Sequence, residues 1–225
     1  MTTNDEAIAG AKEFLLQEYQ SLYSLHQEAK AVGETRLNFF ITFVATVSTA
    51  AIAVQSFISS ELRIWVIAGS TVILIILGLA TYRKMLQRRA VLIIYRRRLS
   101  RIRAWFVKYY PPVIAGLPYD TNQNIKMNWN GKNKLGSTAF SVAFINTALI
   151  TLSVLALGLM SVSLSASGWI VPLALFSGII SWTLHIAWKN NYLKNAENND
   201  QKDLERLDKM ASVQPQPEPA KRKRG

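Results

Sequence analysis

The fold is decided by residues Leu135–Trp188, LGSTAFSVAFINTALITLSVLALGLMSVSLSASGWIVPLALFSGIISWTLHIAW, which contain no Asp, Glu, Lys or Arg. Two further stretches, Leu37–Ser60 and Ile64–Tyr82, are also free of charged residues. A helix needs roughly 20 mostly apolar residues to cross a hydrocarbon core of about 30 Å, so uncharged runs of this length predict membrane-spanning helices. This distribution argues against a soluble globular enzyme.

The long uncharged stretch divides into two spans, because the small residues Ser165–Gly168 in its middle and Trp169 directly after them favour a tight turn at the membrane interface. The sequence therefore predicts an all-α integral membrane protein with four transmembrane helices in two hairpins. The first hairpin occupies residues 37–82 and the second residues 139–188. The predicted spans are Leu37–Phe57, Ile64–Tyr82, Ala139–Leu164 and Trp169–Trp188.

The basic residues predict the orientation of these spans. Three of the 26 Lys and Arg precede the first span, thirteen lie in the central segment Arg83–Leu135, and nine follow Trp188. The two short links between paired spans hold only Arg63. Because Lys and Arg near span ends resist translocation, we expect both termini and the central segment to be cytoplasmic, in an inner (plasma) membrane. An N-terminal signal peptide is not expected, since the first apolar run begins only at Leu37.

Residues 1–36 are expected to form a cytoplasmic amphipathic helix, with Asn4 or Asp5 as N-cap and Gly33 as a break before the first span. Their apolar and aromatic residues recur every three or four positions, which places them on one helix face. These residues are Phe14, Leu15, Tyr19, Leu22, Tyr23 and His26. The segment has a net charge of −3, which favours packing on another helix over binding to an anionic membrane surface.

Residues 83–138 are expected to form a basic cytoplasmic helix followed by a connector. No Gly or Pro occurs from Arg83 to Tyr110, so the second span should continue as one helix until Pro111-Pro112 ends it. A seam at spacings of three and four runs through Leu92, Tyr95, Leu99, Ile102 and Phe106. This seam and the stripe of the acidic first helix predict a cytoplasmic helical bundle.

The remaining cytoplasmic part is the tail, residues 189–225. A short helix is expected at Asp200–Met210, with Leu204 and Leu207 on one side. The residues after it are rich in Pro, Lys and Arg, a composition typical of disorder.

No pattern of catalytic, cofactor or metal-binding residues is present. The sequence lacks a glycine-rich phosphate loop, HExxH and GxSxG, and it contains no cysteine and only two histidines. We therefore expect no catalytic residue, no cofactor and no metal site. His26 is expected to pack among tyrosines, and His185 to lie hydrated at the cytoplasmic end of the fourth span, with a pH-responsive role as the alternative.

Asn146 is the strongest polar side chain inside a predicted span, and Thr147 lies beside it. An amide in hydrocarbon needs a hydrogen-bond partner, so both residues should face another helix. A helix contact is the preferred interpretation and a pore lining the alternative.

Two groups of basic residues are distinguished on the second helix. Arg83, Lys84, Arg88 and Arg89 follow the span directly and are expected at the membrane surface, where they attract anionic lipids. Five further arginines, at positions 96, 97, 98, 101 and 103, lie some 20–30 Å beyond the span at helical rise. An anion-binding group is assigned to Arg96, Arg97, Arg101 and Arg103, since guanidinium groups bind phosphate in a bidentate manner.

These features favour a non-enzymatic multi-pass protein that forms a homo-oligomer or binds an acidic protein through its basic cytoplasmic helices. The alternative is a membrane effector or channel gated by an anionic ligand such as a nucleotide. In outline the arrangement is similar to small multi-pass membrane effectors of bacterial defence systems, which couple helical hairpins to a cytoplasmic sensor. A membrane enzyme ranks third, because the central loop offers only Asp120 as a carboxylate. Nucleic acid is disfavoured, since no nucleic-acid-binding motif accompanies the charge.

Overall fold

The computed structural model describes residues 3–109, 138–161 and 168–213 of the 225-residue chain and is all-helical in these ranges. It shows four helices: α1 (Thr3–Val54), α2 (Ser60–Tyr109), α3 (Thr138–Ser161) and α4 (Ile170–Val213). Pro111-Pro112, the connector Val113–Gly136 and most of the turn at Ser165–Gly168 lie outside the described residues, as does the tail beyond Val213.

All four of these helices are long and apolar enough to cross a membrane. Each of the four helices contains most of one predicted span, so the prediction of an all-helical multi-pass membrane protein is confirmed at this level. Large apolar side chains cover the outer surface of the windows, for example Ile73 on α2 and Ile179 on α4. Such a surface suits contact with lipid, because hydrocarbon imposes no penalty on exposed aliphatic groups.

Two helices are longer than predicted. The N-terminal helix and the first span form the single helix α1, so Gly33 is not a break. The fourth span and the tail form the single helix α4, so the predicted short helix at Asp200–Met210 is not separate. The continuity predicted for the second span holds, since α2 runs without interruption to Tyr109. At 1.5 Å per residue, α2 is about 75 Å long, more than twice the thickness of a hydrocarbon core.

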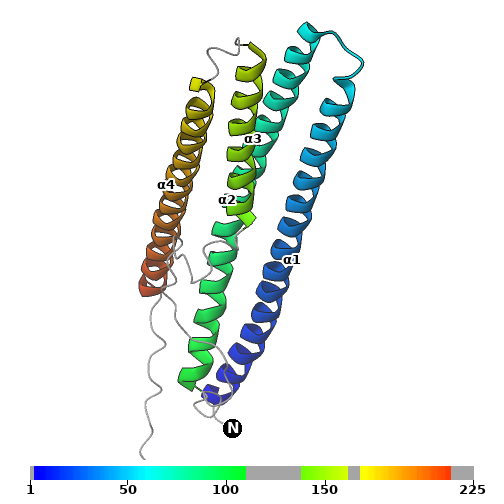
Figure 1. Cartoon of the computed structure of the whole chain (residues 1–225). Coiled ribbons are helices and arrows are strands. Elements are labelled where there is room, and N and C mark those ends of the chain that lie inside the picture. Colours follow the sequence, from blue (N-terminus) through cyan, green and yellow to red (C-terminus); the bar gives the residue numbers. More distant parts are fainter. Residues whose placement is uncertain (1–2, 110–137, 162–167, 214–225) are drawn as a thin grey trace, which may run out of the picture.

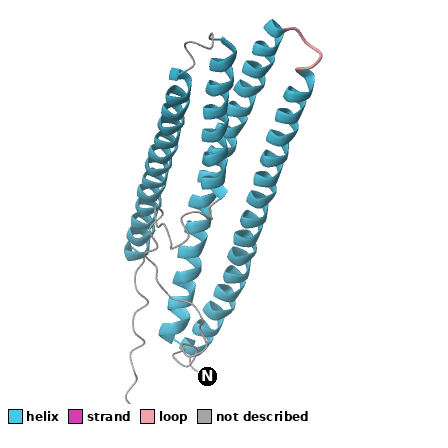
Figure 2. Cartoon of the chain, viewed as in Figure 1, coloured by secondary structure: helices cyan, strands magenta, loops and turns pink. Residues whose placement is uncertain are grey.

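The link between α1 and α2 begins earlier than predicted. Helix α1 ends at Val54 rather than Phe57, and a turn follows in which Gln55 N–H donates to Ile52 O and Phe57 N–H donates to Val54 O. These i to i+3 bonds tighten the end of the helix. Figure 2 shows the resulting loop at one end of the molecule.

The helices lie side by side in the order α1, α2, α3, α4 (Figure 1). Helix α1 packs on α2, α2 on α3, and α3 on α4, while α2 also touches α4. Helices α1 and α4 therefore form the two ends of the row. The main buried cluster joins α1, the middle of α2 and the start of α3 through Phe40, Tyr82, Leu86 and Val142.

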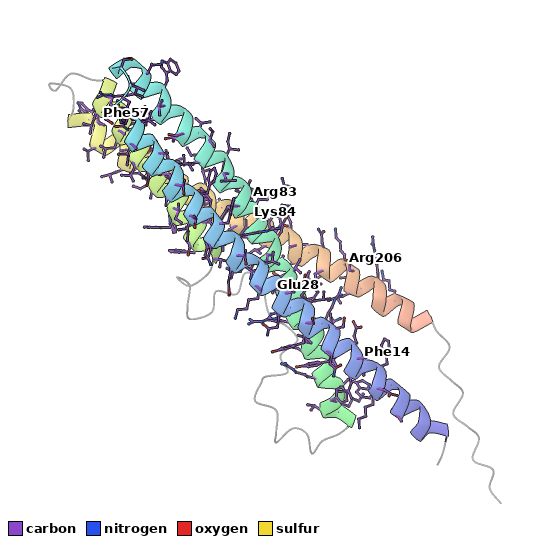
Figure 3. The ribbon with its side chains drawn as sticks, turned by 90° about the vertical axis from the view of Figure 1, so that its right-hand side faces the viewer. Phe14, Glu28, Phe57, Arg83, Lys84 and Arg206 are labelled. Carbon is purple, nitrogen blue, oxygen red and sulfur yellow. The ribbon has the colours of Figure 1, made fainter. Side chains whose placement is uncertain are left out.

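The long helices α1, α2 and α4 extend well past α3 at one end of the molecule (Figure 1). Phe57 lies near the opposite end, whereas Arg83 and Lys84 lie about halfway along the molecule (Figure 3). Phe14 on α1 and Arg206 on α4 belong to the extended part (Figure 3). The basic half of α2 therefore lies between α1 and α4 and is bordered by both.

Candidate functional site: the basic half of α2

The side of α2 that faces α1 carries the predicted seam. Leu99 and Ile102 are buried together with Leu22 of α1, and Leu15, Tyr19, Tyr95 and Phe106 pack around them. Of the predicted stripe on α1, Phe14 and Tyr23 do not join this cluster and are largely exposed. The contact is thus narrower than the stripe, because α2 is the only described helix that packs on α1 in this cluster.

Arg103 is bound to α1 by an aromatic side chain. Its Nη2 donates a hydrogen bond of 2.8 Å to the hydroxyl of Tyr19, and its guanidinium carbon lies 5.5 Å from the centre of the same ring. A guanidinium stacked on an aromatic face gains cation–π attraction in addition to its hydrogen bond. Arg103 therefore acts as part of the contact between α1 and α2.

Arg88 lies directly over Gly33 of α1. Its guanidinium donates to the backbone oxygens of Ala29 and Lys30 and occupies the space that a Cβ of residue 33 would fill. Burial lowers the pKa of Arg88, Glu34 opposes this shift and Arg36 adds to it. The absence of a side chain at Gly33 therefore serves a close helix approach, which is a physical reason for glycine at a position predicted to break the helix.

His26 lies on the same side of α1. Burial lowers the pKa of this imidazole, and the charges of Arg96, Lys30 and Arg88 lower it further. A pKa below the ordinary value of about 6.5 keeps His26 neutral at pH 7. The imidazole therefore adds no charge to the basic region at this pH.

The side of α2 that faces α4 is fixed by an ion-pair network. Arg97 is buried, donates to Glu197 at 3.0 Å, and also pairs with Asp200. Close by, Leu193 is fully buried against Ala90, and Ile93, Ile94 and Tyr192 pack around this pair. These contacts explain why α4 continues past its span instead of ending near Trp188.

A groove of about 390 Å³ lies between α2 and α4 next to this ion pair. Exposed Arg98 and Arg101 line it from α2, and Asp200 and Asp203 line it from α4. Asp203 also lies 3.8 Å from Arg206. The groove therefore contains charges of both signs.

The four arginines predicted to bind an anion do not come together at one site in the structure. Arg97 and Arg101 both line the groove, while Arg103 binds Tyr19 and Arg96 acts on His26 from an exposed position. Arg97 already has two carboxylate partners, which were not foreseen from the sequence because they come from α4.

The four basic residues predicted at the membrane surface differ in their exposure. Arg83 and Lys84 are exposed, as Figure 3 shows for both side chains. Arg88 packs on α1, as described above. Arg89 is half-buried, and burial lowers its pKa while Tyr82 opposes the shift.

A buried polar cluster joins α2, α3 and α4 within the apolar windows. Asn146 is fully buried against Gly78, and its Nδ2 lies 3.4 Å from Nε2 of His185. His185 Nδ1 lies 2.7 Å from the oxygen of Ser181, and the Tyr82 hydroxyl donates to the His185 oxygen at 2.7 Å. Because only a protonated Nδ1 can donate to a carbonyl, Nε2 is left to accept from Asn146 in the neutral ring.

This cluster places Asn146 and the neighbouring Thr147 at a helix contact. Thr147 Oγ1 lies 3.4 Å from the hydroxyl of Ser181 on α4. The expectation that His185 is a hydrated interfacial residue is wrong, since only 5% of its surface is exposed. Its burial arises because α2 and α3 both pack on α4 here, through Tyr82 and Asn146, which the local sequence does not reveal. Within the described residues, Asn146 Oδ1 has no hydrogen-bond partner.

In the part of the chain that the structure describes, no group of three or more His, Cys, Asp or Glu residues is arranged to hold a metal ion. Comparisons with protein-family models, curated proteins and solved structures found no significant match to this chain. The function must therefore be inferred from the helices and contacts described above.

Proposed function

We propose that the chain is a non-enzymatic multi-pass protein of the inner (plasma) membrane that oligomerises or binds partners through the basic half of α2. In this proposal residues 37–82 and 139–188 form two transmembrane hairpins. The extended parts of α1, α2 and α4 form a cytoplasmic helical bundle, and both termini lie on the same side. The distribution of Lys and Arg supports this orientation, because all but one of the 26 lie outside the two short links.

One observation carries the proposal: α2 passes without a break from an apolar window into a basic segment in which Arg98 and Arg101 remain exposed beside the groove to α4. Helix α1 covers one side of this segment, where Leu99 is buried, and α4 covers another side, where Arg97 is buried. Lys84, Val91 and Arg98 are exposed and follow one another at intervals of seven residues, which keeps them on nearly one side of the helix. A continuous rigid helix that presents uncovered arginines is suited to receive a partner.

The distance of each basic residue from the bilayer determines which partner it can attract. Attraction to an anionic bilayer fades within a Debye length of about 8 Å at physiological salt. Lys84 lies within this range of the span end, whereas Arg98 lies some 24 Å beyond Tyr82 at helical rise. We therefore assign anionic lipid to Arg83 and Lys84, and an acidic protein surface or a second copy to Arg98 and Arg101.

The second candidate is a membrane effector or channel gated by an anionic ligand, for example in a bacterial defence system. The groove between α2 and α4 favours it, because Arg98 and Arg101 line a space of suitable size for a phosphate-bearing ligand. The carboxylates of Asp200 and Asp203 in the same groove weaken it, since they repel an anion. This candidate therefore ranks below partner binding.

The test uses the full chain purified in mild detergent. We expect a defined oligomer by mass measurement and no ion flux in liposomes, with or without nucleoside triphosphates. Arg98→Gln with Arg101→Gln should weaken the assembly by roughly tenfold, since two exposed charge contacts contribute about 1.4 kcal/mol. Arg83→Gln with Lys84→Gln removes the same charge as a control and should leave the mass unchanged.

A monomer without flux would contradict oligomerisation. Flux that depends on nucleoside triphosphates, and that is lost in the variant with Arg98→Gln and Arg101→Gln, would establish the second candidate instead.

A further inference from the structure

The face of α1 that points away from α2 has an unusual composition within the apolar window. Phe40 and Val44 on the opposite face pack against α2 and α3. The outward face carries Asn38, Thr42, Ala45 and Thr49, which follow one another at spacings of four, three and four and are all exposed. This spacing places the four side chains in one line along the helix.

This line is unlike the outward faces of the other helices. The exposed residues of α2 and α4 at similar positions are mostly large and aliphatic, such as Ile73, Ile76, Ile179 and Leu184. The exposed Thr183 of α4 donates its hydroxyl hydrogen to the backbone oxygen of Ile180. In contrast, the line on α1 presents an amide and two hydroxyl groups. A polar group exposed to hydrocarbon lacks the hydrogen bonds that water would supply, so such groups normally face another helix.

Few of these polar groups are satisfied within the chain. Thr46, beside the line, donates to the backbone oxygen of Thr42 at 2.9 Å. Asn38, Thr42 and Thr49 have no side-chain hydrogen bond within the described residues. Helix α1 is also an end of the row, so none of the other three described helices lies beyond this face (Figure 1).

The line continues beyond the apolar window without a charged residue. Thr35, Ala31, Gln27, Ser24 and Gln20 extend it at the same spacings of three and four, and all five are exposed. Charged residues are frequent in this part of α1, where Lys12, Glu18, Glu28, Lys30, Glu34 and Arg36 occur. Glu34, one helical turn before Asn38, is exposed and borders the line. The line itself, over Gln20–Thr49, presents only amides, hydroxyls and small side chains, which can set the register of a helix seam.

We propose that this outward face of α1, Gln20–Thr49, is the surface on which a second copy of the chain docks through its own α1. A twofold axis places the same face on both subunits, so each amide or hydroxyl meets an equivalent group that can both donate and accept. The small side chain of Ala45 lets the two backbones approach closely. This inference rests on the proposed oligomeric function and names the surface in the membrane that forms the oligomer.

The test exploits the absence of cysteine from the chain. Single variants Thr42→Cys, Ala45→Cys and Thr49→Cys are oxidised in membranes, and the disulfide-linked dimer is quantified on a non-reducing gel. A disulfide needs Cα atoms within about 7 Å, so only residues at the contact can form it efficiently. Ile73→Cys and Ile179→Cys, on the outward faces of α2 and α4, serve as controls.

We expect at least tenfold more dimer from the best α1 variant than from either control. Adding Ala45→Leu to Thr42→Cys should reduce this dimer several-fold, because the larger side chain separates the helices. Equal dimer yields from α1 and control variants would overturn the inference. If the wild-type chain is an oligomer in detergent but α1 variants give no dimer, the inference fails while the proposed function stands. A monomeric wild-type chain would contradict both the inference and the proposed oligomerisation.

Discussion

Replacing both Leu99 and Ile102 with aspartate should separate α1 from the basic half of α2. Each residue is less than a tenth exposed, and both pack on Leu22. Each substitution loses about 1.5–3 kcal/mol of apolar burial, and the new carboxylates would have to be buried without a basic partner arranged for them. We expect a large fall in the thermal midpoint and rapid proteolysis of the N-terminal part of α1, at sites such as Lys12 and Lys30.

The matched control is Leu25→Asp with Val32→Asp on the exposed side of α1. These changes add the same charge without removing a buried contact, so the thermal midpoint should stay within about two degrees of the wild-type value. An unchanged midpoint in the variant with Leu99→Asp and Ile102→Asp would mean that this seam does not hold α1 on α2.

Arg97→Ala should weaken the contact between α2 and the extended part of α4. The side chains of Arg97, Glu197 and Asp200 are 11%, 24% and 12% exposed, so removing the arginine leaves two largely buried carboxylates without their counter-charge. Breaking a buried ion pair on one side costs about 3–5 kcal/mol, and the partial exposure of Glu197 favours the lower end. The free energy of unfolding in detergent measures this loss.

Two further variants make the interpretation specific. Arg101→Ala removes an exposed arginine one helical turn further on and should change stability by less than about 1 kcal/mol. Combining Arg97→Ala with Glu197→Ala and Asp200→Ala removes both sides of the network and should recover much of the loss. A triple variant no more stable than the variant with Arg97→Ala alone would contradict the ion-pair explanation.

The apolar windows and the continuity of α2 could be predicted because they depend on local composition. Uncharged runs and the absence of Gly and Pro act on the backbone directly, whatever the rest of the chain does. The seam at Leu99 and Ile102 was found for a similar reason, since helical spacing alone places these residues on one face.

The extension of α4 could not be predicted in this way. The sequence after Trp188 contains five Asn between Asn190 and Asn199, a residue with weak helix propensity. Burial of Leu193 against Ala90 and the ion pairs of Arg97 stabilise the helix there, and these are contacts with a helix about 100 residues away in the chain. Tertiary packing therefore overrides the local preference.

Local sequence was also insufficient to predict the roles of two single residues, Gly33 and His185. Glycine is compatible both with a helix break and with a close approach, and only the position of Arg88 on α2 distinguishes the two. A histidine near a span end is compatible with hydration until Tyr82 and Asn146 are known to pack against it. In both cases the deciding neighbour comes from another helix.

The position of the central segment relative to the membrane tests the proposed account most directly. Reporters are fused after Gly225, within Val113–Gly136, and within Ile58–Arg63, and their compartment is read in intact cells. We predict that the first two report the cytoplasm and the third reports the outside. If the reporter within Val113–Gly136 lay outside, the thirteen basic residues of Arg83–Leu135 would have crossed the membrane. That result would contradict the proposed cytoplasmic bundle and the function assigned to α2.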